Sequence, residues 1–195
     1  MKRKTATVRT ASRAARQVGA RTLALLAVIG KAHRPQDVRP WVEKHGVARY
    51  LSPVESRFFE RPRPPKAIRV SMSWRTEALA ALLWALRGTT NMPSLAVPFD
   101  VWSNELARRA LKDPSAFLRN VRLRPKSEIV NMEAFLYRQH WRVRDAELSG
   151  PGAHIREPGD PPLEELDPEI VYERRYALSW LIAPQTEWDS VPTDT

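Results

Sequence analysis

The residues best suited to binding or catalysis lie on three predicted helices, where charged side chains share a face with tryptophan. On the last of these helices, Glu173, Ala177 and Trp180 recur at the spacing of one helical face. A tryptophan on a helix of a folded domain is expected to face the core. The spacing therefore predicts that Glu173, Arg174 or both point inward or lie at the rim of the core.

Two other predicted helices also carry charged or polar side chains on or beside a face that is expected to be buried. In the segment 127–147, an apolar stripe contains a histidine and has a tryptophan and an arginine beside it. The turn before the apolar run 78–86 brings together tryptophan, arginine and glutamate. The residues concerned are Arg138, His140 and Trp141 on the first helix and Trp74, Arg75 and Glu77 on the second.

Charged groups that are buried singly cost several kcal/mol, so we expect these side chains to meet in one shared polar cluster. Its predicted members are Arg75 and Arg138 or Arg174, facing Glu77 and Glu173, with Trp74, Trp141 and Trp180 as walls. Two interpretations are open. The cluster is a structural network that fixes helix packing, or it is a pocket whose arginines bind phosphate or carboxylate and whose Glu77, Glu173 or His140 performs acid–base chemistry.

The C-terminal segment "EWDSVPTDT" (187–195) combines a large apolar side chain with carboxylates. Chain ends fray unless they are tied down. Trp188 can anchor the segment, and Asp189 is an anion beside a basic body. We therefore predict a C-terminal strap, in which Trp188 fills a groove and Asp189 forms an ion pair with an arginine of the body.

Several kinds of catalytic chemistry have no signature in the 195 residues. The chain has no cysteine, which excludes disulfides, cysteine-ligated metals and a cysteine nucleophile. It has only 7 glycines and no Gly-rich phosphate loop, no G-x-S-x-G and no H-E-x-x-H. The histidines at 33, 45, 140 and 154 share no short metal-ligand spacing. We predict neither a metal nor a cofactor.

The elements that must position these residues are helices. Three starts pair an N-cap residue with a following proline, which satisfies free amides at a helix start. The run 78–86 is apolar on all sides and predicts a buried helix from about 73 to 87, stopped at Gly88. Further helices are expected at 10–32, with its arginines in water, at 100–112 and at 127–147. The three capped starts are Ser52-Pro53 with Glu55, Asp113-Pro114 and Asp167-Pro168.

These elements predict an all-α fold, a single compact domain of about seven helices around the central buried helix, closed by the C-terminal strap. Residues 1–8 are expected to be a disordered basic N-terminus, and 9–195 to form the domain, with a long polar loop at 149–166. Only 94–99 offers a pattern that could be a short strand.

The charge is unevenly distributed. The chain carries a net charge of +10, but residues 145–195 hold 3 Lys and Arg against 12 Asp and Glu. A basic body of this kind favours either a polyanion surface, with 10–32 and 118–126 as candidates, or internal neutralisation by the acidic quarter. No apolar run is long enough to span a membrane, and we expect a cytoplasmic protein.

Several segments together resemble a bacterial domain-of-unknown-function family, numbered 4272, over roughly 9–195. Two positions depart from the family pattern: Arg175 stands where histidine is frequent, and Ser179 where asparagine is frequent. The resemblance implies no established activity, cofactor or partner, but it draws attention to the same polar and aromatic residues. The segments are "RTLALLAVI", "LSPVE", "FFERP", "SWRTEALAALLWAL", "LYRQHWRVRD", "ERRYALSWL" and "WDSVPTDT".

Without a catalytic signature, we expect a non-catalytic protein-interaction or accessory protein, for example an immunity-type protein that covers an acidic partner. One alternative is weak, sequence-independent binding of nucleic acid or another polyanion by the basic body. Another is an enzyme that uses the Arg/Glu/His pocket on an unknown substrate.

Overall fold

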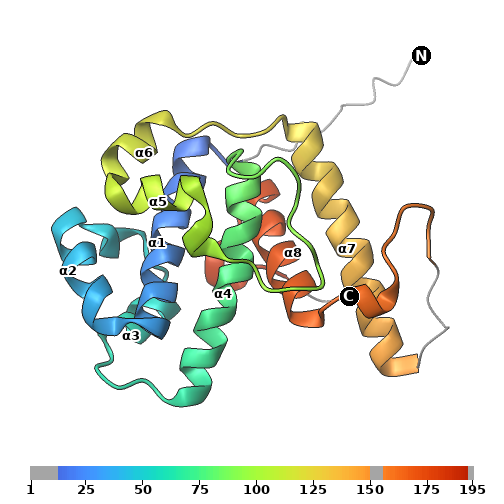
Figure 1. Ribbon diagram of the computed structural model, residues 1–195, viewed down its shortest axis with the longest axis horizontal. Coiled ribbons are helices and arrows are strands. Elements are labelled where there is room, and N and C mark those ends of the chain that lie inside the picture. The colour runs from blue at the N-terminus through green and yellow to red at the C-terminus, as the bar shows by residue number, and fades with distance from the viewer. Residues whose placement is uncertain (1–12, 150–155, 193–195) are drawn as a thin grey trace, which may run out of the picture.

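Two helices that are buried on almost every side form the centre of the protein. The computed structural model describes residues 13–149 and 156–192. Helix α1 (Ala15–His33) is completely buried from Arg21 to Lys31, and α4 (Lys66–Ala85) is completely buried from Glu77 onward. These helices pack against each other, and α8 (Pro168–Ile182) packs on α4 from the other side (Figure 1).

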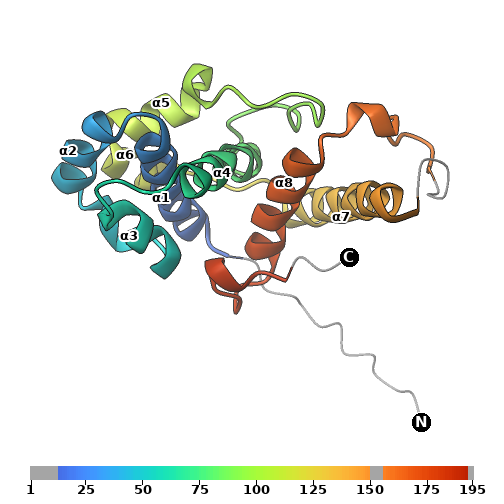
Figure 2. The same ribbon diagram turned by 90° about the horizontal axis from the view of Figure 1, so that it is seen from below.

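The other helices surround this centre. Helices α2 (Pro35–His45) and α3 (Pro53–Glu60) pack on α1, as do α5 (Glu105–Lys112) and α6 (Pro114–Asn120). Helix α7 (Lys126–Ser149) packs on α8 and forms the outer edge of the molecule (Figure 2). Short 3₁₀ turns complete the order: η1 (Val47–Tyr50), η2 (Val101–Ser103), η3 (Leu163–Glu165) and η4 (Trp188–Ser190).

The predicted all-α class is confirmed. The described residues form eight α-helices in one compact domain and contain no strand, so the segment 94–99 is irregular rather than a short strand. In the same part of the chain, no helix has both the length and the apolar character needed to cross a membrane. The predicted disordered segment 1–8 lies outside the described residues.

All three predicted helix starts are confirmed by their cap geometry. The Ser52 hydroxyl accepts the amide of Glu55, and the Glu55 carboxylate accepts the amide of Ser52 at 2.9 Å, which completes a capping box. Asp113 accepts the amide of Ala116 at 2.9 Å, and Asp167 accepts the amides at 169 and 170. These capping hydrogen bonds join residues two or three positions apart, so they depend mainly on the local sequence.

The central helix is longer than the predicted 73–87. It begins at Lys66, directly after Pro64 and Pro65, because proline has no amide hydrogen for a helix interior. It ends at Ala85 because Arg87, and not Gly88, takes the left-handed conformation, with φ at 65°. The predicted helix 100–112 is also divided, since Asn104 caps a new start by accepting the amide of Ala107.

The expectation that the arginines of the first helix face water is wrong for Arg21, whose exposed fraction is 5%. Arg21 lies on α1 between Val18 and Leu25, both buried, at helical spacing. A charge at such a position needs a buried partner, and Glu55 of α3 provides it.

Candidate functional site

The most deeply buried ion pair links the central helix to α8. Arg174 donates from Nε and Nη2 to Glu77 at 3.1 and 2.7 Å, and both side chains are at most 1% exposed. The third guanidinium nitrogen of Arg174, Nη1, donates to the carbonyls of Pro93 and Ser94, and the other carboxylate oxygen of Glu77 accepts the amide of Phe99 at 2.8 Å. The pair therefore also fixes the irregular segment after α4.

A second pair on the same two helices lies nearer the surface. Arg75 donates to Glu173 at 3.1 Å, and its guanidinium carbon lies 4.7 Å from the ring centroid of Tyr176. Burial raises the pKa of Glu173 to about 7, although the charge and hydrogen bond of Arg75 act in the opposite direction. Burial lowers the pKa of Arg75, but Glu173, Tyr176 and Glu55 together outweigh it and the net shift is upward.

This second pair borders an open cavity of about 770 Å³ between α4 and α8. Trp74 and Tyr172 line it together with Arg75 and Glu173, and Lys66 and Glu169 also contribute. An arginine beside a carboxylate with a pKa near 7 could bind an anion or transfer a proton. However, only 7% of the Glu173 side chain is exposed, and its carboxylate is already held by Arg75.

A third buried pair was not predicted. Arg21 donates to Glu55, and both side chains are at most 5% exposed. Arg21 also lies over the ring of Trp188, with 4.7 Å from the guanidinium carbon to the centroid. The sequence held a signal for this pair, because Arg21 falls on the apolar face of its helix and Glu55 closes a capping box.

The C-terminal strap is anchored as predicted at its tryptophan. Trp188 is 4% exposed and makes edge-to-face contacts with Tyr176 and Trp180, at centroid distances of 5.0 and 5.3 Å. The Tyr176 hydroxyl donates to the carbonyl of Trp188, and burial raises the pKa of this hydroxyl to about 12. Arg13 holds the segment before the strap, since it donates to the carbonyls of residues 180, 183 and 186.

Among the described residues, no arginine lies within ion-pair distance of Asp189, so the predicted ion pair is not seen there. Asp189 instead accepts hydrogen bonds from the hydroxyl of Ser52 at 2.7 Å and from the amide of Val54 at 2.9 Å. These groups form the first turn of α3, where free amides and the helix dipole favour an anion. The strap therefore binds a helix start, and Asp194 lies outside the described residues.

The residues predicted on α7 do not join the pairs of α4 and α8. Arg138 binds Asp160 at 2.7 Å and Glu157 at 3.4 Å, and Gln139 also donates to Asp160. These hydrogen bonds, with Arg138 as the main cause, lower the pKa of Asp160 to about 2. Arg138 thus fixes the polar segment before α8. Trp141 is 41% exposed, so it is not a wall of the cluster, because it lies on the outward face of its helix.

His140 is buried, as predicted, but its partner is an arginine. Arg175 donates from Nη1 to Nδ1 of His140 at 2.6 Å, and Tyr172 meets the imidazole edge to face at 5.5 Å. Because an arginine can only donate, the accepting nitrogen must be unprotonated. Burial, with further contributions from Arg175 and Arg144, lowers the pKa of His140 to about 4. His140 is therefore neutral at pH 7.

This shift predicts a pH dependence of stability. The folded-state pKa lies below the usual 6.5, so His140 contributes stability that is present above pH 6.5 and lost as the pH falls toward 4. We expect the unfolding free energy of the wild type to fall more in this range than that of His140→Asn, whose amide oxygen preserves an acceptor for Arg175. Urea unfolding of both proteins at pH 7 and pH 5 measures the difference, and an equal loss in both would contradict it.

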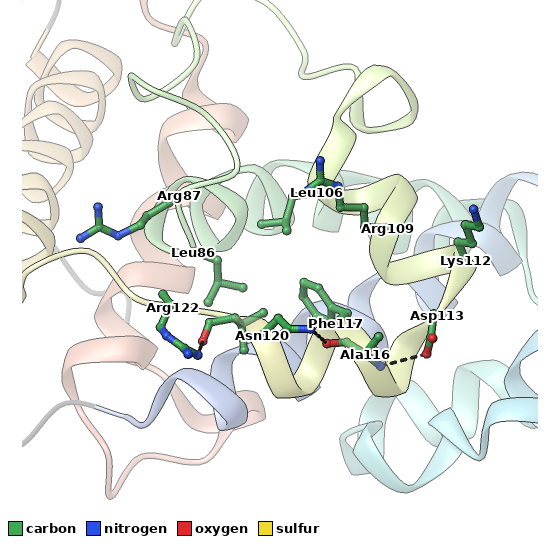
Figure 3. Close-up of a pocket in the computed structure, with 11 residues that line it drawn as sticks. Leu86, Arg87, Leu106, Arg109, Lys112, Asp113, Ala116, Phe117, Asn120 and Arg122 are labelled. Atoms are coloured by element: carbon green, nitrogen blue, oxygen red, sulfur yellow. Dashed lines mark hydrogen bonds between the residues drawn. The ribbon is translucent and has the colours of Figure 1, made fainter.

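A separate groove lies between the end of α4, α5 and α6, with a cavity volume of about 540 Å³. Figure 3 shows Leu86, Leu106 and Phe117 directed toward its centre. Its edge carries four basic residues and one acid, Asp113, whose carboxylate already caps α6. Sequence reasoning missed this groove because its lining comes from three separate segments. The basic residues are Arg87, Arg109, Lys112 and Arg122.

The predicted site residues therefore divide into several places. Arg75, Glu77, Glu173 and Arg174 meet between α4 and α8, and the Trp188 strap packs beside them, whereas the residues of α7 serve other contacts. Within residues 13–149 and 156–192, no group of three or more His, Asp or Glu side chains could hold a metal ion.

Comparison with known proteins gives one match. A family model, described as a domain of unknown function, matches residues 5–191. No curated protein and no solved structure matches the chain.

Proposed function

The chain belongs to this family, DUF4272, and we propose that it is a non-catalytic protein-interaction domain that binds an acidic, partly apolar segment of a partner. The proposal rests on the site alone, because the family description names no function. The observation that supports this proposal is the groove between α4, α5 and α6, with its apolar floor and four basic residues at its edge. Apolar centres with charged rims are common in protein interfaces, and complementary charge guides the partner.

The buried ion pairs favour the same conclusion. The Glu77 and Glu55 carboxylates and the His140 imidazole each have an arginine partner, and each of these side chains is at most 4% exposed. Such networks orient packed helices and leave little room for a substrate. An enzyme remains the alternative with one observation in its favour, the Glu173 carboxylate with a pKa of about 7 beside an open cavity.

Binding of nucleic acid is supported less well, because one of the basic residues in the candidate segment 118–126, Arg124, is engaged within the fold. Arg124 donates to the carbonyls of Trp84, Thr89 and Thr90, at the carboxyl end of α4. A cation at a helix C-terminus is stabilising, so Arg124 has a structural role.

An accessory or immunity-type protein that covers an acidic segment would need a surface like the groove. This proposal includes a cytoplasmic location, in keeping with a chain that has no cysteine for the disulfides of secreted domains. The partner would then be an intracellular protein with exposed Asp or Glu beside apolar side chains.

Designed peptides test the proposal. We expect an acidic amphipathic helical peptide to bind more tightly than a scrambled peptide of the same composition or a basic amphipathic one. Lys112→Glu/Arg122→Glu should weaken binding of the acidic peptide about 10-fold, since both charges at the groove edge are reversed. The measurement is fluorescence anisotropy with labelled peptides at near-physiological salt.

The matched control is Lys66→Glu/Arg69→Glu, which makes the same charge change on exposed residues at the opposite end of α4. It should leave binding unchanged. Equal affinity for the scrambled peptide would contradict recognition of an amphipathic segment. If duplex DNA also competed equally, and binding faded between about 50 and 200 mM salt, general polyanion binding would be the better description.

A further inference from the structure

The outward face of α7 carries an apolar stripe at the spacing of a coiled-coil seam. Val130, Tyr137, Trp141 and Leu148 are among the exposed large hydrophobic residues, with exposed fractions of 37, 46, 41 and 79%. With Ala134 and the exposed Arg144, they occupy positions separated alternately by four and three residues, so the stripe is apolar except at Arg144. This is the a/d spacing by which one helix packs on another.

The stripe lies on a different face of α7 from the one that is buried against the domain. The buried face contains Ile129, Leu136 and Val143, about a third of a turn away from the stripe. Helix α7 lies at one side of the helical bundle in both views (Figures 1 and 2), and the exposed fractions of the stripe residues show that this face is accessible. The Tyr137 ring is held in place from one side by Arg175, whose guanidinium carbon lies 4.4 Å from the centroid.

We propose that a second copy of this chain covers the stripe, so that two α7 helices pack antiparallel around a two-fold axis between Tyr137 and Trp141. This register pairs side chains of complementary size. Tyr137 meets Trp141 of the partner subunit, Val130 meets Leu148 of the partner subunit, and the small Ala134 faces the long Arg144 of the partner subunit. Central aromatic residues of this kind dominate the energy of many interfaces.

Charge favours a second copy at this helix over other surfaces of the chain. The whole chain has a net charge of +10, so two copies repel each other over most approaches. Helix α7 holds four basic and four acidic residues and is neutral as a unit. Two α7 helices can therefore approach without this repulsion, and the self-pairing is isologous, as in most homodimers.

Sedimentation equilibrium of the full chain over about 5 to 100 µM tests the association. We expect the mass of the wild type to rise from 22.3 kDa toward twice that value. Trp141→Glu, which acts twice in a two-fold interface, should weaken association at least about 100-fold. Leu148→Glu is a second variant at the edge of the stripe, and circular dichroism confirms that each variant is folded.

The matched control is Trp102→Glu, because Trp102 is also about half exposed, at 46%, but lies in η2, outside the stripe. It should dimerise like the wild type. A wild type that stays monomeric across the concentration range would overturn the proposal. So would a dimer that survives Trp141→Glu, and equal weakening by Trp102→Glu would point to nonspecific association.

Cysteine cross-linking tests the register, since the chain has no native cysteine. Residues 130 and 148 are about 27 Å apart along one helix, too far for a disulfide within one chain. We expect Val130→Cys/Leu148→Cys to form a disulfide-linked dimer on oxidation, whereas neither single cysteine does. A dimer linked efficiently through either single cysteine would instead indicate parallel helices and overturn the antiparallel register.

Discussion

Replacing Trp188 by alanine is expected to lower the free energy of unfolding by about 3–5 kcal/mol. The side chain is 4% exposed and packs on Tyr176 and Trp180, with Arg21 over its ring. Its loss would leave a cavity at the junction of α1, α4 and α8 and would loosen Asp189 from the start of α3.

Urea unfolding of the wild type and Trp188→Ala measures this effect, and Trp102→Ala is the matched control. Trp102 is 46% exposed, so its removal should cost far less. Deletion of residues 188–195 should reproduce most of the loss, because it removes the same anchor. If the truncated protein and the wild type unfold at the same urea concentration, the strap has no structural role and its Trp-Asp pair is better explained as a partner-binding tag.

The second large effect is expected from Glu77→Ala, also about 3–5 kcal/mol. The substitution leaves Arg174, which is 0% exposed, without its carboxylate, and it removes the acceptor for the amide of Phe99. Removing one partner of a buried ion pair costs more than the pair contributes, because the remaining charge stays buried. Glu173→Ala should cost less, since Arg75 is partly exposed and can be hydrated.

Two further variants separate the ion pair from the loss of side-chain volume. Glu105→Ala removes a carboxylate that binds Arg108 and Arg109 on the surface, and we expect a far smaller loss of stability than for Glu77→Ala, because water screens exposed pairs. Glu77→Gln keeps the shape and one acceptor, so it should fall between the wild type and Glu77→Ala. A Glu77→Ala protein as stable as Glu105→Ala would mean that Arg174 reaches water or another acceptor.

The two functional proposals use different surfaces, which makes their tests independent. The groove lies among α4, α5 and α6, whereas the stripe is on α7. A protein that dimerises through α7 would present two grooves to a partner, and such bivalency raises apparent affinity without new contacts. Peptide binding by Trp141→Glu, compared with the wild type, shows whether the groove functions in a single copy.

The sequence alone determined the features that depend on neighbouring residues. The capped starts at Ser52, Asp113 and Asp167 follow from hydrogen bonds that span three residues, and the apolar run 78–86 has no polar face to present to water. Helical spacing also predicts that Glu173 or Arg174, and Arg138 or His140, point toward the core, because a stripe of large apolar side chains fixes which face of a helix is buried; Glu173, Arg174 and His140 are the ones that are buried.

Only the tertiary structure decided how these residues pair. Periodicity shows that a side chain points inward but carries no information about which helix lies opposite, so Arg138 was assigned to Glu77 or Glu173 although Asp160 is its partner. Asp189 is expected from its charge to pair with an arginine, whereas the Ser52 hydroxyl and the Val54 amide at the start of α3 bind it. The groove is assembled from three segments, and the exposure of the α7 stripe follows from its place at the edge of the fold. Both depend on how distant segments pack, which no local pattern specifies.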